Sequence, residues 1–105
     1  MRPVLWSATA RTELLDIVRF IAEANPIAAA KVAERVDTAA SGLGRLAIGR
    51  RGRVAGTFEK PVVGLPYIIA YAIDDAGTAV GSGSIVILHV IHAARDWPDG
   101  RWPND

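Results

Sequence analysis

Six side chains in this sequence could together cleave an RNA phosphodiester without a metal ion. Such chemistry needs a base for the 2′-hydroxyl, an acid for the leaving oxygen and cations for the charge that develops on the phosphate. The residues able to supply these roles are Arg50, Arg51, Arg53, Tyr71, His92 and Arg95. Their spacing does not show that they meet, and the sequence has neither a nucleophile-and-base motif nor a phosphate-binding glycine loop.

The two histidines, His89 and His92, have an HxxH spacing that invites a metal site. Residues three apart on a strand point to opposite faces, and the sequence has no cysteine, so we expect no metal and no cofactor. We predict that His89 is an interior or edge side chain with a hydrogen-bond partner. His92, at a strand end beside Arg95 and Asp96, is the stronger candidate for function, although a structural contact would also explain it.

Two apolar segments in the second half organise the chain. Residues 67–73 and 84–92 are rich in β-branched and aromatic side chains, which predicts two strands paired as an antiparallel hairpin across a long connection at 74–83. Alternation predicts two faces for the later strand: Ile85, Ile87, His89 and Ile91 on one, and Val86, Leu88, Val90 and His92 on the other. Since both faces are apolar, we expect helices on one and a partner on the other. The alternative is that the chain itself covers both.

The first part of the chain predicts a short strand at residues 4–6 and then a helix at 8–24. Ser7 or Thr9 can cap this helix by accepting a backbone hydrogen bond. Apolar residues recur along it at helical spacing, and the charged residues between them, Glu13 included, should be solvated.

Asn25-Pro26 should end that helix and begin a second one at 26–46. Proline disfavours helical geometry in the residue before it and suits the first position of a new helix. A further strand is expected at 53–63, broken at Gly56 or Pro61. The resulting order is β-α-α-β-β-β, an α+β fold in which a helical hairpin packs on a small, mostly antiparallel sheet.

Composition narrows the class of protein. A chain of 105 residues should form a single domain spanning 1–105. The lack of cysteine excludes disulfides and thiolate catalysis, and no stretch resembles a signal peptide or spans a bilayer, so we expect a cytoplasmic protein with no membrane association. The net charge of +1 is uneven, because residues 1–53 hold nine Arg or Lys against five Asp or Glu. This basic excess could serve an anionic ligand or an acidic protein.

Four segments in order resemble the RelE/ParE superfamily of toxins from bacterial type II toxin–antitoxin systems, particularly its ParE-like, plasmid-stabilisation branch. They are WSATARTELLDIVRFIAEANPIAAAKVAERV, GRVAGTFE, LPYIIAYAID and VILHVIHAARDWP. The resemblance implies a toxin that arrests growth, with a groove between sheet and helical hairpin for a cognate antitoxin in a hetero-oligomer. Phe58 stands where many relatives carry a basic residue, and the connection at 74–83 is longer than usual.

The resemblance implies one of two targets. ParE-type members poison DNA gyrase, whereas RelE-type members cut messenger RNA on the ribosome and tend to use lysines, arginines and a late tyrosine. This chain has only Lys31 and Lys60 and no tyrosine after Tyr71. We therefore favour a non-enzymatic gyrase inhibitor over a ribosome-dependent mRNA endoribonuclease, with an inactive antitoxin-binding remnant third. A free-standing nucleic-acid-binding module fits least, because the basic cluster lacks interleaved aromatics.

Contacts to the target are predicted in the C-terminal tail. His92, Arg95, Trp97 and Trp102 lie there, and Arg and Trp are enriched at binding hot spots. The alternative is that Trp97-Pro98 packs the end of the chain onto the core.

Overall fold

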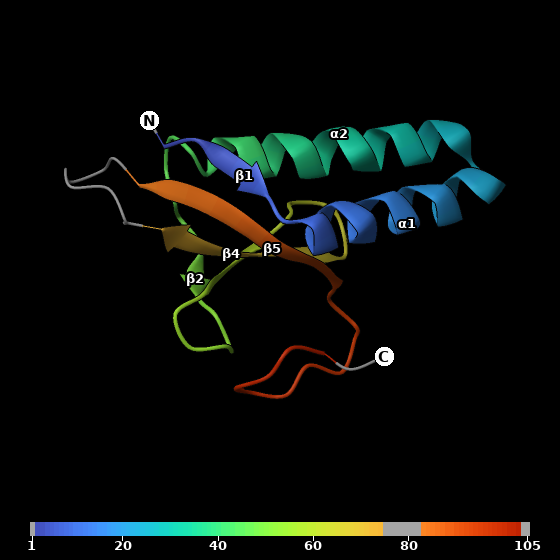
Figure 1. Ribbon diagram of the computed structural model, residues 1–105. Helices are drawn as coiled ribbons and strands as arrows, with labels where there is room; N and C mark the ends of the chain where they lie inside the picture. Colours follow the sequence, from blue (N-terminus) through green and yellow to red (C-terminus); the bar gives the residue numbers. More distant parts are fainter. Residues whose placement is uncertain (1, 75–82, 104–105) are drawn as a thin grey trace.

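The computed structural model describes residues 2–74 and 83–103. The elements in order are β1 (Val4–Trp6), α1 (Ala8–Ala24), α2 (Pro26–Gly42), β2 (Arg50–Arg51), β3 (Phe58–Pro61), β4 (Tyr67–Asp74) and β5 (Ser84–His92). The two helices lie side by side over one face of the sheet, and the C-terminal tail returns beneath the opposite face (Figure 1). The α+β fold with a helical hairpin on a sheet is therefore confirmed.

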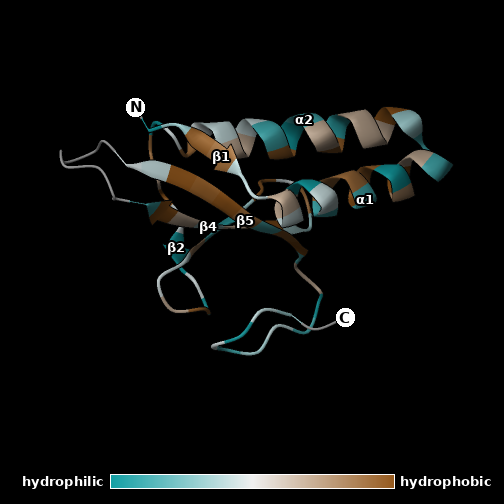
Figure 2. Ribbon diagram, viewed as in Figure 1, coloured by the Kyte–Doolittle hydropathy of each residue, from teal (hydrophilic) through white to brown (hydrophobic). Residues whose placement is uncertain are grey.

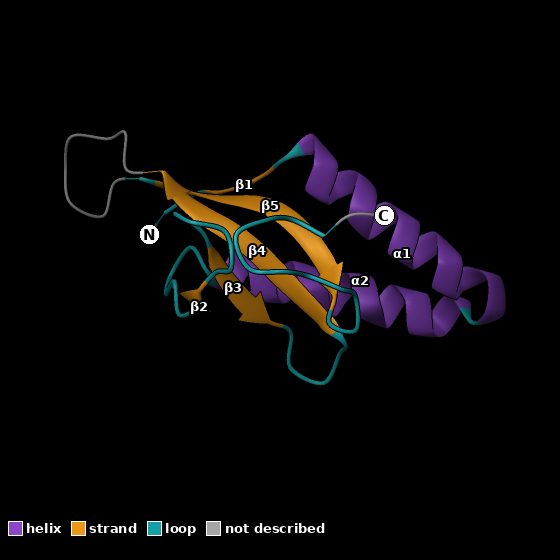
Figure 3. Ribbon diagram, turned by 90° about the horizontal axis from the view of Figure 1, so that it is seen from below, coloured by secondary structure: helices purple, strands orange, loops and turns teal. Residues whose placement is uncertain are grey.

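The five strands form one sheet in the order β1-β5-β4-β3-β2. β1 runs parallel to β5, whereas the β5–β4, β4–β3 and β3–β2 pairs are antiparallel, as expected for a mostly antiparallel sheet. The predicted hairpin of β4 and β5 is confirmed, and residues 75–82 of its long connection lie outside the described residues. Figure 3 shows the strands with the helical hairpin behind them.

Capping side chains determine where the two helices start. The Ser7 hydroxyl accepts the Ala10 N–H at 3.0 Å, and the Asn25 side chain accepts the Ala28 N–H at 3.1 Å, so each caps the helix that follows it. α2 ends at Gly42, four residues before the expected end at 46. Gly42 and Gly44 favour helix poorly, and the Leu43 N–H already bonds back to Ala40 in a tight final turn.

The predicted strand at 53–63 is wrong at its start. The structure divides this region into β2 and β3, and Arg53 lies in the turn between them. Gly56 occupies the left-handed region with φ of 80°, which a residue without Cβ adopts readily, so the break falls there. Pro61 is instead the last residue of β3.

A β-bulge changes the faces of β5. Ala70 pairs with His89 while Tyr71 pairs with Ile87, which leaves Leu88 as an extra residue. Val90 therefore packs with the helix-side core, whereas Ile91 belongs to the cluster on the opposite face. The strict alternation predicted for β5 is correct up to Ile87 and wrong beyond it.

The larger core lies between the helices and the sheet. Its buried members are Ala10, Val32, Val36, Ala40, Leu43, Val62, Ile69, Tyr71, Ile85, Ile87 and Val90. Figure 2 shows that β5 is hydrophobic along most of its length, whereas the helices alternate hydrophilic and hydrophobic residues around their surface. No helix within the described ranges is both long and apolar enough to span a membrane.

A smaller cluster covers the opposite face of the sheet. Ile68, Ala70 and Ile91 pack there against Trp97, with Trp102 beside them. The tail that carries both tryptophans crosses this face (Figure 3). The expectation of an open apolar face awaiting a partner is therefore wrong, because the chain covers both faces itself.

Candidate functional site

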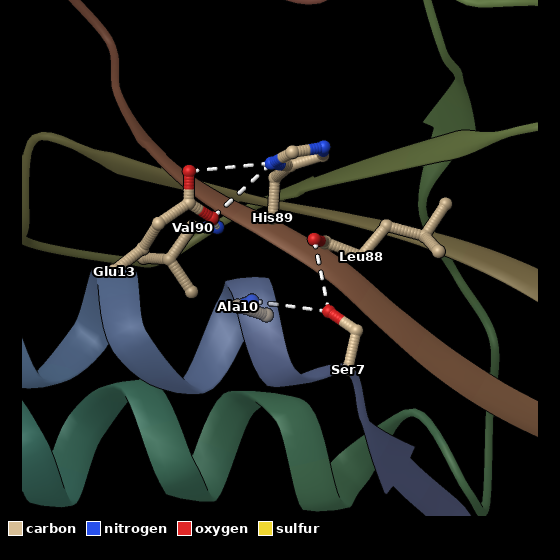
Figure 4. Close-up of polar contacts among 6 residues, drawn as sticks. All are labelled: Ser7, Ala10, Glu13, Leu88, His89 and Val90. Atoms are coloured by element: carbon tan, nitrogen blue, oxygen red, sulfur yellow. Dashed lines mark hydrogen bonds and ion pairs between the residues drawn. The ribbon is translucent and has the colours of Figure 1, made fainter.

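α1 covers the edge of β5 that the short β1 leaves open (Figure 4). The Ser7 N–H donates to the carbonyl of Ile87 at 2.9 Å, and the Ser7 hydroxyl donates to that of Leu88 at 3.1 Å. The Val90 N–H then donates to a carboxylate oxygen of Glu13 at 3.1 Å. Glu13 is therefore half-buried and engaged, so the expectation that it is solvated is wrong.

The same carboxylate holds His89. The Nδ1 atom of His89 lies 3.2 Å from both oxygens of Glu13, which confirms the predicted hydrogen-bond partner. The other side of the His89 ring meets Trp102, with ring centroids 4.3 Å apart. His89 thus joins α1 to the C-terminal tail.

His92 is exposed and lies on the other side of β5. Its ring meets that of Tyr67 edge to face at 5.4 Å, and its Nδ1 accepts the Ala94 N–H at 3.0 Å. No cluster of three or more potential His, Asp or Glu metal ligands occurs among the residues that the structure describes.

An open groove of about 540 Å³ lies between α1 and the adjoining ends of β4 and β5. The residues that line it are Glu13, Asp16, Ile17, Phe20, Ile21, Tyr67, Val90, His92 and Arg95. Two predicted site residues, His92 and Arg95, meet here. Tyr67 joins them and was missed from the sequence, although its position opposite His92 in the hairpin could have indicated it.

The arginines of the basic cluster have different environments. Glu59 is only 1% exposed, and it binds Arg50 Nη2 at 3.3 Å and the Arg53 N–H at 2.7 Å. The Arg53 guanidinium lies 3.7 Å from the same carboxylate and 4.3 Å from the centroid of the Trp97 ring. Arg51 is exposed on β2. Arg50 and Arg53 are thus held by a buried carboxylate.

Tyr71 lies inside the helix-side core. Its hydroxyl accepts the Gly49 N–H at 2.9 Å, and its ring stacks on Phe58 with centroids 5.5 Å apart. Burial raises the pKa of Tyr71 above the usual 10.0, although the hydrogen bond from Gly49 opposes this shift. Phe58 therefore packs on Tyr71.

The structure does not gather the six candidates for RNA cleavage into one site. β4 and β3 lie between β5, which ends at His92, and β2, which carries Arg50 and Arg51. Neighbouring strands lie about 4.8 Å apart, so β5 and β2, which are three spacings from each other, are separated by roughly 14 Å. Only His92 and Arg95 share the groove beside α1.

The tail residues divide into buried and accessible ones. Trp97 is 9% exposed, and its indole nitrogen has no hydrogen-bond partner within the described part of the chain. Trp102 is half-buried, with its ring centroid 5.8 Å from that of Trp97. Packing of the chain end onto the core, the alternative considered for Trp97, describes the observed geometry.

Comparisons with known proteins identify the class. The family model described as the ParE toxin of type II toxin-antitoxin system, parDE, matches residues 4–97. Y4kP of Sinorhizobium fredii is 36% identical over 96 residues, covering 90% of this chain and 92% of the relative. Toxin RelE2 of Caulobacter vibrioides is 35% identical over 96 residues, covering 90% and 99%.

The chain belongs to the ParE family of toxins, within the RelE/ParE superfamily. Its fold is similar to that of a chain in a solved structure titled chromosomal ParDE TA system from P. aeruginosa, with a TM-score of 0.76 at 19% identity. That match covers 88% of this chain and 96% of the other. Membership of this family implies a toxin component with a cognate antitoxin as its partner.

Proposed function

We propose that this toxin inhibits DNA gyrase without acting as an enzyme and so arrests growth, and that its antitoxin occupies the groove beside α1. The observation that carries the choice of target is the enclosed hydroxyl of Tyr71, which accepts the Gly49 N–H inside the core. A buried phenol with a raised pKa is poorly placed to exchange protons with an RNA strand.

The groove has two carboxylates against one arginine, and this balance of charge also favours a protein ligand over RNA. Glu13 and Asp16 line it together with Ile17, Phe20 and Ile21. Carboxylates repel the phosphates of a polyanion, whereas an amphipathic segment of an antitoxin could place apolar side chains on Phe20 and a basic one near Asp16. Phe20 is 76% exposed, as expected for a contact completed by another chain.

The proposed surface for gyrase is the tail with the end of β5. Its accessible members are His92 and Arg95, whereas Trp97 and Trp102 pack the tail onto the Ile68, Ala70 and Ile91 cluster of the sheet. Binding to a protein target needs only a correctly shaped surface. The distance between the arginines on β2 and those of the tail therefore counts against an RNA-cleaving site but not against a gyrase-binding surface. We place this action in the cytoplasm, where both DNA gyrase and the antitoxin would meet the toxin.

One observation keeps the ribosome-dependent mRNA endoribonuclease as the second candidate. The groove brings Tyr67, His92 and Arg95 together, which supplies a phenol, an imidazole and a cation in one place. One of the relatives is also named Toxin RelE2. This candidate is second because the carboxylates of Glu13 and Asp16 in the same groove would repel the phosphates of an RNA strand.

The test compares the two targets directly. Purified toxin is assayed for inhibition of gyrase supercoiling and for cleavage of ribosome-bound message, with His92→Gln and Arg95→Ala beside the natural sequence. We expect inhibition of supercoiling, weakened about tenfold or more in Arg95→Ala if this residue is a hot spot. Arg11→Ala, on the exposed face of α1, is the matched control.

A different result would reverse the order. If message is cut at specific sites while supercoiling is unaffected, and Tyr67→Phe abolishes the cutting, the endoribonuclease is the correct function. If the toxin affects neither target but still binds its antitoxin, it is the inactive remnant.

A further inference from the structure

We infer that Arg53 and His89 are positioning residues that hold the C-terminal tail, residues 93–103, across the sheet in the arrangement that meets the target. This inference rests on the proposed role of the tail in target binding. Neither residue lines the groove that contains His92 and Arg95. Their contacts instead fasten the tail at two separate points.

The first point joins the tail to the β2–β3 turn. The guanidinium of Arg53 lies 4.3 Å from the ring centroid of Trp97, a cation–π contact. The carbonyl of Arg53 also accepts the Gly100 N–H at 2.8 Å. Arg53 itself is oriented by Glu59, whose carboxylate accepts its N–H at 2.7 Å and lies 3.7 Å from its guanidinium.

The second point joins the tail to α1. The ring of His89 lies 4.3 Å from that of Trp102, while its Nδ1 atom contacts the carboxylate of Glu13 at 3.2 Å. Glu13 is itself fixed by the Val90 N–H at 3.1 Å. The imidazole therefore has its ring on Trp102 of the tail and its Nδ1 atom on Glu13 of α1. Figure 4 shows the contact with Glu13.

The two points form one continuous stack. Its members in order are Arg53, Trp97, Trp102 and His89, and the ring centroids of Trp97 and Trp102 are 5.8 Å apart. A carboxylate lies at each end, Glu59 beside Arg53 and Glu13 beside His89. A segment without regular secondary structure opens easily unless side chains hold it. We therefore assign the ordering of the tail to this stack.

The stack determines which side of the tail faces outward. Trp97 and Trp102 lie against the Ile68, Ala70 and Ile91 cluster, whereas Arg101 is exposed in the turn at Gly100. Holding the tryptophans thus keeps the polar side of the tail in a defined place, with the Gly100 N–H on the Arg53 carbonyl of the β2–β3 turn. Such preorganisation reduces the ordering cost of binding.

The experiment measures tail order and activity separately on the full chain. Trypsin cleavage after Arg101 reports release of the tail, and the red shift of tryptophan emission reports exposure of Trp97 and Trp102 over the constant contribution of Trp6. We expect Arg53→Ala and His89→Ala to raise the tail cleavage rate roughly five- to tenfold, since each removes the side-chain contact at one point of attachment. Arg53→Ala keeps the backbone carbonyl that accepts the Gly100 N–H, so its effect reports the cation–π contact with Trp97. Inhibition of gyrase should weaken by a similar factor.

Conservative variants separate positioning from general loss of structure. Arg53→Lys keeps a cation near Glu59 but loses the planar guanidinium that stacks on Trp97, so we expect only partial rescue. His89→Phe keeps a ring against Trp102 but loses the contact with the Glu13 carboxylate, so it should hold the tail better than His89→Ala. Far-UV circular dichroism checks the helices and strands, and Arg11→Ala, exposed on α1, should leave every measurement unchanged.

Three outcomes distinguish the possibilities. If neither alanine variant releases the tail, the inference is wrong. If the tail is released while gyrase inhibition stays at its original level, the tail is attached as described but its position does not matter, which also overturns the inference. If the natural protein never inhibits gyrase, the proposed function fails, and the cleavage rates alone still decide whether Arg53 and His89 hold the tail.

Discussion

The backbone N–H of Gly49 donates a 2.9 Å hydrogen bond to the hydroxyl of Tyr71, which lies 22 residues later in the chain. This contact ties the loop before β2 to the helix-side core. It also removes the phenol of Tyr71 from any surface site. A residue that could have served acid–base chemistry thus has a structural role.

Replacement of Tyr71 by Phe should lower the free energy of unfolding by about 1–3 kcal/mol, because the half-buried Gly49 N–H loses its acceptor. Chemical denaturation at neutral pH measures this change. An unchanged unfolding midpoint would mean that the hydrogen bond does not form in solution.

The same substitution should change the behaviour of the protein in alkali. Burial raises the pKa of Tyr71 in the folded state above 10.0, so the unfolded state releases this proton first. Above about pH 10, stability therefore falls as pH rises towards the folded-state pKa. The difference in unfolding free energy between the natural protein and Tyr71→Phe should shrink over this window, and a constant difference would contradict the explanation.

Gly49→Ala should destabilise the protein for a steric reason. A Cβ atom at this position would lie 2.6 Å from the Tyr71 hydroxyl and 2.8 Å from the Glu59 carbonyl. Overpacking of this kind costs about 1–3 kcal/mol. Gly42→Ala is the matched control, since a Cβ there meets nothing within 4 Å and alanine favours helix. Thermal unfolding of both variants should show a loss for Gly49→Ala alone.

Trp97 allows packing to be separated from hydrogen bonding. Its indole N–H is buried without a partner among the described residues, so Trp97→Phe removes an unsatisfied donor while keeping a ring, and we expect a change within about 1.5 kcal/mol. Trp97→Ala should instead cost about 3–5 kcal/mol, because it uncovers Ile68 and Ile91. Equal losses in both variants would indicate that the N–H finds an acceptor in solution.

Antitoxin binding provides a test of the groove beside α1. Phe20→Ser should weaken the affinity for the antitoxin about tenfold or more if Phe20 is an anchor of the interface. Ile27→Ser, on α2 and outside the groove, is a matched control because Ile27 is 72% exposed and Phe20 76%. Isothermal titration with the antitoxin measures both, and equal affinities would place the antitoxin elsewhere.

The helical hairpin was predictable because its signals are local. Ser7 and Asn25 accept backbone N–H groups three residues ahead, and Pro26 has a fixed backbone geometry suited to a first helical position. The pairing of β4 with β5 was likewise indicated by their apolar, β-branched composition.

The site could not be derived in this way, because its contacts join residues far apart in the chain. The His89–Glu13 contact spans 76 residues and the Ser7–Leu88 hydrogen bond spans 81. Both exist because β1 pairs in parallel with β5 and brings the start of α1 to the edge of that strand. Periodicity in one segment contains no information about such a register.

The sequence by itself determined the two helices, the late hairpin and the family resemblance, since capping, proline geometry and apolar patterning act within a few residues. The tertiary structure alone decided that Leu88 is an extra residue at the bulge, that Val90 therefore turns to the helices, and that Trp97 and Trp102 close the opposite face. The position of a bulge depends on how whole strands pair, and the path of a tail depends on the apolar surface that it covers. Both therefore depend on free energies summed over the assembled sheet.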